Sequence, residues 1–268
     1  MSLPLYGLGI NTIKLENAAG TSLSYPFQVK EIENKLRRTA AACDMIIPIT
    51  NWYKEVLLKN GVAINKLKVV LQGLPTNVEV IVKQPLELPL RLVFVGRIDQ
   101  LKGIDLLIDA VRKFNKKEIM LDIYGTTDNH TFLEACKKKS AVSGNIQWKG
   151  LLPPAEVTKM LTQYHALILP SIVAEMSPLV IQEAFAAGIP IVGSNIYGIA
   201  EQVKDGFNGL LFTINSVRSL QGVLQRLVSS PLILLQLSHN IIAPRSFANV
   251  AEETVNAYQT VLSTSKAE

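Results

Sequence analysis

A chain of 268 residues with 48% apolar and 18% charged residues is a globular protein rather than a disordered one, and it can bury one large core or two smaller ones. No apolar run approaches the roughly 18 to 20 residues that cross a bilayer, and we see no signal peptide. The two cysteines, Cys43 and Cys136, fit no metal-binding or redox spacing, so we expect a reducing, cytoplasmic compartment.

The net charge of +5 is concentrated in residues 1–75, which hold nine Lys or Arg against five Asp or Glu. This basic segment could face an anionic lipid surface or an acidic substrate. The simpler interpretation is a solvated helix face, because Glu31/Lys35 and Glu33/Arg37 are i,i+4 pairs. Aromatic residues make up only 6% and do not interleave with basic ones, so we expect no nucleic-acid partner.

Apolar periodicity predicts helices and strands that alternate along the chain. In chain order, residues 29–42 are expected to form a helix, 45–50 a strand, 51–60 a helix and 67–72 a strand, before a linker with one short strand at 76–90. A second series predicts strands at 92–95, 120–124, 146–149, 166–169, 190–193 and 209–212, and helices at 102–114, 129–139, 154–163, 178–187, 215–229, 231–240 and 247–262.

The strands of the second series are almost continuously apolar rather than alternating. This pattern is typical of a parallel sheet with helices on both faces, so the sequence predicts an α/β fold with a Rossmann-like, doubly wound sheet. Ligands of such sheets bind beyond the carboxyl ends of the strands.

Two carboxylates, Glu175 and Glu183, stand eight positions apart around the start of the predicted helix 178–187. A carboxylate accepts hydrogen bonds from hydroxyl groups, which suits a ribose diol or a sugar. From these residues alone, an amphipathic helix whose Glu183 is simply exposed is an equally good interpretation.

The start of the same helix is a candidate anion site. Ser177 suits the N-cap and Pro178 the first helical position. The N–H groups of Leu179 and Val180 would then point out of the helix, where an anion also gains from the helix dipole.

A second phosphate-binding candidate follows the predicted strand 92–95. Gly96 lets the backbone turn sharply, and Arg97 and Lys102 lie on the loop and at the next helix start, before Gly103. Two cations this close could clamp a diphosphate. The alternative, surface cations near a helix start, is electrostatically unfavourable.

These segments, taken in order, resemble the retaining GT-B glycosyltransferases of family 4, the group 1 glycosyl transferases. The resemblance covers roughly residues 30–262 and adds the end of the family's first domain, seen in Ala41-Ala-Cys-Asp44 and the residues after it. The segments that match in the second half are Gly96-Arg97-Ile-Asp-Gln-Leu-Lys102-Gly103, then Glu175 and Glu183 with Gly188-Ile-Pro190, then Gly198-Ile-Ala-Glu201 with Asp205-Gly206-Phe-Asn208-Gly209.

The resemblance implies a role for each of these residues, with a nucleotide-diphosphate sugar as co-substrate, no other cofactor and no metal. Arg97, Lys102 and Glu175 would act at the reacting centre, the cations on the diphosphate and Glu175 on the sugar hydroxyls. The remaining donor-binding residues would be Gly96 in the loop, Gly150 and Leu152 at the base, Ser177, Pro178, Leu179 and Val180 at phosphate or sugar, and Glu183 at the ribose.

The chain is shorter than the family's usual length, so we expect it to be truncated. We expect a remnant of the acceptor-side domain at 1–75, the nucleotide-sugar-binding domain at 76–245 and a crossover helix at 246–268. The family's sugar-facing histidine has no counterpart here, and His165, before a buried strand, is expected to be structural. Ser177-Pro178 replaces the family's frequent Phe-Gly.

The implied function is a hexosyltransferase of EC 2.4 type that acts in polysaccharide biosynthesis on a glycan or lipid-linked acceptor. The isolated chain would be inactive, and any membrane contact would be peripheral, at the inner face. Two alternatives remain open: a sugar-nucleotide epimerase of the same fold, and a noncatalytic nucleotide-sugar-binding module. A phosphorylase lacks a convincing cofactor lysine, and a dehydrogenase lacks Gly-x-Gly-x-x-Gly after a strand.

Overall fold

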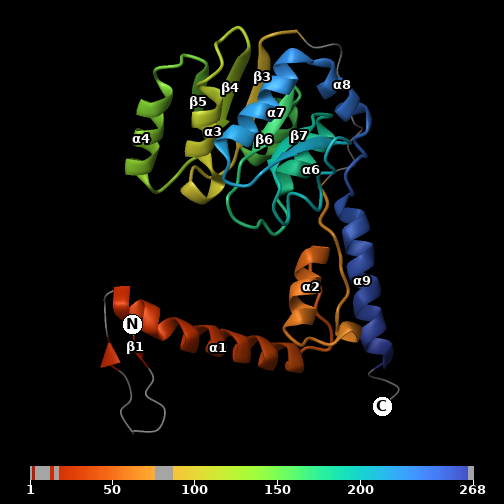
Figure 1. Cartoon of the computed structure of the whole chain (residues 1–268). Coiled ribbons are helices and arrows are strands. Elements are labelled where there is room, and N and C mark those ends of the chain that lie inside the picture. The colour runs from red at the N-terminus through yellow and green to blue at the C-terminus, as the bar shows by residue number, and fades with distance from the viewer. Residues whose placement is uncertain (1, 4–12, 15–17, 76–86, 265–268) are drawn as a thin grey trace. The chain divides into compact units, whose positions relative to one another are not determined.

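The computed structural model describes the backbone of residues 2–3, 13–14, 18–75 and 87–264, and the side chains of residues 29–75 and 87–263 (Figure 1). The chain divides into two compact units. The smaller unit comprises Met1–Pro48, Tyr53–Val69 and Ala257–Glu268, and the larger unit comprises Ile49–Trp52 and Val70–Asn256.

The larger unit is built on a six-stranded parallel sheet with the order β5-β4-β3-β6-β7-β8. The α/β fold predicted from the apolar strands is therefore confirmed. Its strands are β3 (Leu90–Val95), β4 (Ile119–Tyr124), β5 (Ile146–Gly150), β6 (Ala166–Leu169), β7 (Ile191–Ser194) and β8 (Gly209–Phe212).

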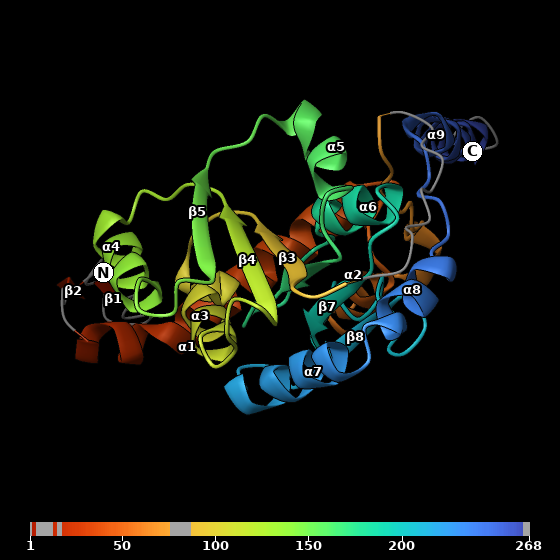
Figure 2. The same cartoon turned by 90° about the horizontal axis from the view of Figure 1, so that it is seen from above.

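Helices cover both faces of this sheet, as Figure 2 shows. One apolar core joins the sheet to α3, α4, α7 and α8, and a second core joins it to α5 and α6. The bounds are α3 (Ile104–Val111), α4 (His130–Ser140), α5 (Val157–Leu161), α6 (Leu179–Ala186), α7 (Val217–Ser229) and α8 (Leu232–His239).

The smaller unit contains helices and little sheet. Lys66 donates from Nζ to the carbonyls of Ala40, Ala41 and Cys43 and so satisfies the end of the first helix. Its strands are β1 (Ser2–Leu3) and β2 (Ile13–Lys14), which are antiparallel. Its helices are α1 (Ala18–Ala42), most of α2 (Asn51–Lys59) and the 3-10 turn η1 (Ile64–Lys66). Helix α9 (Phe247–Thr264) contributes residues to both units.

Two strands predicted for the first part of the chain, 45–50 and 67–72, do not form. The segments meet only at a single parallel bridge between Ile46 and Leu67. A strand needs a neighbour along its length, and among the described residues the next bridge is at Leu74, which pairs with Ser246 instead. The linker prediction at 76–90 falls mostly on residues 76–86, which lie outside the described residues.

The predicted helices exist, with different ends. The helix predicted at 29–42 starts earlier, at Ala18. The helix predicted at 102–114 is a 3-10 turn, η2 (Gln100–Lys102), followed by α3, because Gly103 takes a left-handed conformation between them. The helix predicted at 154–163 likewise begins as a 3-10 turn, η3 (Pro154–Glu156), before α5. None of the described helices is both long and apolar enough to cross a membrane.

Candidate functional site

The order of the strands defines where a ligand should bind. From β3 the chain moves outward through β4 and β5, and it then returns to the other side of β3 to build β6, β7 and β8. The point between β3 and β6 is thus the topological switch point of the sheet. Ligands of open parallel sheets bind beyond the carboxyl ends of the strands at such a point.

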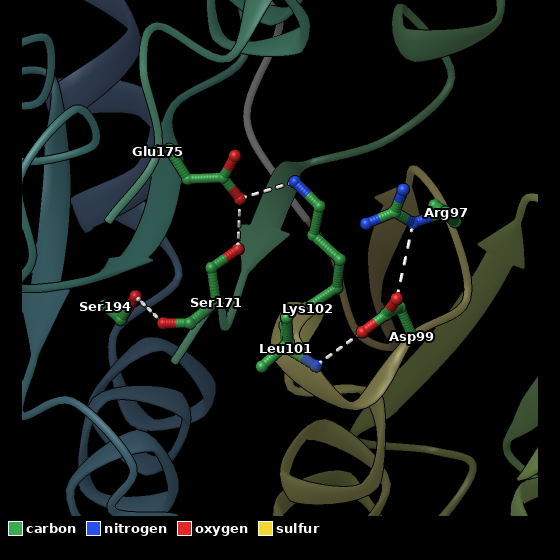
Figure 3. A network of polar contacts seen from close by, with 7 residues as sticks. All are labelled: Arg97, Asp99, Leu101, Lys102, Ser171, Glu175 and Ser194. Carbon is green, nitrogen blue, oxygen red and sulfur yellow. Dashed lines mark hydrogen bonds and ion pairs between the residues drawn. The ribbon is translucent and has the colours of Figure 1, made fainter. Parts of the chain in front are cut away.

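The loop after β3 brings two cations to this edge. Asp99 caps η2 by accepting a hydrogen bond from the amide of Leu101 at 2.7 Å, which fixes the turn that carries Lys102. Arg97 is 65% exposed, and its Nε lies 3.4 Å from Asp99 Oδ2. Lys102 is only 27% exposed and points across to the neighbouring loop (Figure 3).

The loop after β6 brings a carboxylate to the same place. Glu175 Oε1 accepts hydrogen bonds from Lys102 Nζ and from Ser171 Oγ, each at 2.6 Å. Ser194, fully buried at the end of β7, donates from Oγ to the carbonyl of Ser171 at 2.6 Å. Figure 3 shows this chain of contacts running from Ser194 through Ser171 and Glu175 to Lys102.

Close backbone packing holds the two loops together. The amide of Ile172 donates to the carbonyl of Leu101 at 2.9 Å. At Gly103, a Cβ would lie 2.0 Å from the carbonyl oxygen of Pro170, so only glycine permits this approach. The relative position of the cations and the carboxylate is therefore set by backbone contacts and not only by their own side chains.

Helix α6 begins beside these groups. Its N-cap position is Pro178 and not Ser177, because Pro178 has an extended ψ of 112° and Leu179 is the first helical residue. The prediction that Ser177 caps the helix and that Pro178 is its first residue is therefore wrong, because Ser177 precedes the cap position and the helix start has no side-chain capping hydrogen bond. The amides of Leu179 and Val180 still stand in the first turn, where no intrahelical carbonyl reaches them.

Together these elements enclose a cavity of about 430 Å³, which we call the switch-point pocket. It collects predicted residues from both loops and from the helix start, although they come from segments roughly eighty residues apart. Its walls are Phe94, Val95, Gly96, Arg97, Lys102, Leu169, Ser171, Glu175, Pro178, Leu179 and Val180.

A second hollow of about 330 Å³ shares Gly96 and Arg97 with the switch-point pocket, so the two are adjacent. Leu152, one of the predicted base-binding residues, lines it, and the carbonyl of Gly150 accepts a hydrogen bond from the amide of Gly125 at 2.8 Å beside it. The remaining walls are Val95, Tyr124, Gly125, Thr126 and Leu151. Its mostly apolar walls suit a flat ring system.

Three predicted residues line neither hollow: Gly150, which lies beside the second one, Glu183 and Ser177. Glu183 lies on the second turn of α6 and lines neither of them; burial raises the pKa of its carboxyl above the ordinary value of 4.5. Ser177 lines a different cavity of about 290 Å³, which also includes Gln182, Glu201 and Arg245.

Three side chains that organise the pocket were not singled out from the sequence: Asp99, Ser171 and Ser194. Ser171 and Asp99 stand in loops that directly follow buried strands, which is the one signal that could have identified them. Ser194 gives no such signal, because its partner is a backbone carbonyl 23 positions away.

His165, which we expected to be structural, lies at the opposite end of the sheet from the pocket. Its Nδ1 accepts a hydrogen bond from the amide of Arg91 at 3.1 Å.

No group of three or more His, Cys, Asp or Glu side chains suited to a metal ion occurs within the described part of the chain. The groups that line the switch-point pocket offer hydrogen bonding and charge: the guanidinium of Arg97 and the ammonium of Lys102, the first amides of α6 for an anion, and the carboxylate of Glu175 for hydroxyl groups.

A family model described as "Glycosyl transferases group 1" matches residues 80–243, more than half of the chain and the whole of the sheet. The chain belongs to this family. Among curated relatives, it is 26% identical over 218 residues to the amylovoran biosynthesis glycosyltransferase AmsK of Erwinia amylovora, covering 78% of this chain and 53% of AmsK. The chain spans about half the length of the curated relatives it matches.

Solved structures agree on the fold. Anabaena HepE, crystallised with UDP and glucose, superposes with a TM-score of 0.65 at 16% identity over 88% of this chain and 68% of HepE. The sucrose-phosphate synthase of Thermosynechococcus elongatus gives a TM-score of 0.71 at 20% identity over 87% of this chain and 62% of that protein. The larger unit therefore has the α/β fold of GT-B glycosyltransferases, with a parallel sheet and helices on both of its faces.

Proposed function

We propose that this chain carries the donor site of a retaining glycosyltransferase, which moves a hexose from a nucleotide-diphosphate sugar to a glycan or lipid-linked acceptor. The observation that carries the proposal is the switch-point pocket, where Arg97, Lys102, Glu175 and the start of α6 meet beyond the ends of β3 and β6. No separate cofactor or metal is part of the proposal.

The parts of the donor match the parts of the pocket. The diphosphate would lie against Arg97, Lys102 and the first amides of α6, which can donate hydrogen bonds to its phosphate oxygens. The sugar hydroxyls would bond to Glu175, and the base would enter the adjacent hollow at Leu152. We place the ribose toward Glu183, in keeping with the family motif.

The comparisons support the same assignment at a coarser level. The family match supports glycosyl transfer. HepE was also crystallised with UDP-glucose, a nucleotide sugar of the kind we propose as donor here. AmsK is named for amylovoran biosynthesis, and we propose that the present chain serves polysaccharide biosynthesis in the cytoplasm. Any contact with a membrane would be peripheral.

In the proposed reaction the protein chiefly positions the donor and stabilises the departing diphosphate. The bond between the sugar and the phosphate breaks, and the acceptor hydroxyl bonds to the sugar on the same face. The acceptor's proton moves to the oxygen of the leaving phosphate. Lys102, Arg97 and the amides of Leu179 and Val180 would bind the negative charge that develops there.

Calorimetric titration of the chain with UDP, GDP and ADP tests the donor site. We expect one of the three nucleotides to bind preferentially, and Lys102→Ala and Arg97→Ala each to weaken that binding about tenfold, because each removes a positive charge beside the phosphates. Lys137→Ala, which removes an exposed cation on α4 outside the pocket, is the matched control and should leave the affinity unchanged. Failure of all three nucleotides to bind would contradict the proposal.

A further inference from the structure

Lys102, the less exposed of the two cations in the switch-point pocket, already forms an ion pair. Lys102 Nζ lies 2.6 Å from Glu175 Oε1, and the two side chains are 27% and 15% exposed. The other cation, Arg97, is 65% exposed and faces Asp99 at 3.4 Å. The formal charges of the two pairs cancel, so these side chains together present little net positive charge to an arriving anion.

Further contacts hold the Glu175 carboxylate and the backbone that carries it. Ser171, which is 1% exposed, donates to the same Oε1 at 2.6 Å. The Glu175 amide donates to the carbonyl of Tyr197 at 3.0 Å, and a Cβ on Gly198 would lie 1.8 Å from the Glu175 carbonyl oxygen. A diphosphate that reaches Lys102 would therefore meet a fixed negative charge.

A fixed carboxylate affects two ligands in opposite ways. It repels phosphate oxygens and competes with them for the Lys102 ammonium, at a partly buried site where water screens the charges less than at the surface. It accepts hydrogen bonds from hydroxyl groups, which a bare nucleoside diphosphate lacks at this position and a nucleotide sugar supplies.

We propose that Glu175 makes the pocket select nucleotide sugars over bare nucleoside diphosphates. With a sugar present, its hydroxyl groups satisfy Glu175 and release Lys102 for the phosphates. After transfer the remaining diphosphate no longer offers those hydroxyls, so Glu175 pairs with Lys102 again and promotes release of the product. This inference rests on the proposed function, since it assumes that the diphosphate of a donor lies at Lys102.

Glu175→Gln in the whole chain tests the inference, with matched ligand pairs as probes: UDP and UDP-glucose, GDP and GDP-mannose, ADP and ADP-glucose. Glutamine keeps the size of the side chain and can still accept a hydrogen bond from Ser171. We expect the variant to bind the bare diphosphate about tenfold more tightly, and to lose most of the wild-type preference for the sugar conjugate. The gain for the bare diphosphate should shrink at high salt.

Asp99→Asn is the control for a general gain of positive charge. It removes the carboxylate beside Arg97 while an amide oxygen remains to cap η2. Because Arg97 would face the phosphates that both ligands share, this variant should leave the ratio of the two affinities unchanged. Unchanged or weaker diphosphate binding by Glu175→Gln would overturn the inference, as would an equal shift of the ratio in both variants. If the wild-type chain bound none of the probes, the proposed function would fall as well.

Discussion

At the scale of single residues, the two ion pairs of the pocket differ in what they can do. Arg97 and Asp99 form an exposed pair at 3.4 Å, the kind that contributes about 0–1 kcal/mol and rearranges freely. Lys102 and Glu175 form a shorter and less exposed pair, and the buried Ser171 donates a further hydrogen bond to the Glu175 carboxylate. The second pair is hence the one whose disruption should change what the pocket binds.

Glu183 gives a prediction about pH. Burial holds the pKa of its carboxyl above 4.5 in the free protein, whereas ribose hydroxyls would donate to and stabilise the charged form. Binding of a nucleotide sugar should therefore release a proton, and the affinity should fall as the pH drops through the raised pKa. Calorimetry across this range, in buffers of different ionisation enthalpy, measures the release.

Glu183→Gln is the control for that titration, because it removes the ionisable group and keeps a hydrogen-bond acceptor. The pH dependence should be absent in this variant. If the variant kept the full pH dependence, another group would be responsible and Glu183 would not contact the ribose. A nucleotide sugar is preferable to a nucleoside diphosphate here, since its phosphates do not titrate in the range.

At the scale of elements, the segment at Gly198 supports the loop after β6. Gly198 has φ +85°, and a Cβ would lie 1.8 Å from the Glu175 carbonyl oxygen. Gly198→Ala should lower the free energy of unfolding by about 3 kcal/mol, through backbone strain plus a clash that must move the loop, and should weaken nucleotide-sugar binding. Urea unfolding and calorimetry measure the two effects.

Gly206→Ala is the matched comparison. Gly206 has a similar φ of +72°, but a Cβ there meets nothing within 4 Å. Gly206→Ala should lower the free energy of unfolding by only about 1 kcal/mol, the cost of an alanine in the left-handed region, and should leave nucleotide-sugar binding unchanged. If both variants lost the same free energy of unfolding, the close contact between Gly198 and Glu175 would not contribute to stability.

The sequence predicted the elements of the larger unit well, because most of its strands are apolar on both faces and every strand except β7 is followed by a helix. It failed at 45–50 and 67–72, where apolar residues are locally strand-like but have no neighbouring strand in the part of the chain that the structure describes. It also failed at Ser177, since both Ser177 and Pro178 are compatible with a helix start. The pairing of Lys102 with Glu175, 73 positions apart, depends on β3 lying beside β6 and has no local signal.

At the scale of the whole molecule, the chain contains the complete sheet that carries the pocket but spans about half the length of the curated relatives it matches. Binding of a donor requires the pocket, whereas transfer also requires an acceptor hydroxyl aligned with the sugar. We therefore expect the 268-residue chain to bind donor but to show no transferase turnover.

This expectation can be measured by release of nucleoside diphosphate from the best-bound nucleotide sugar, with and without an oligosaccharide acceptor. The rate should equal that of a Lys102→Ala sample in both conditions. Acceptor-dependent release above that background would show that the present chain suffices for catalysis.

The contact between Gly103 and Pro170 also restricts how this site can be re-engineered. The backbone of the loop that carries the cations packs against the loop that carries the carboxylate too closely for any side chain at Gly103. The backbone of Gly198 packs equally closely against the second loop, at Glu175. Replacing only one loop with that of a relative would pair two backbone surfaces whose shapes do not match. A chimaera should retain its binding only when 96–103, 170–178 and 197–198 are transplanted as one set.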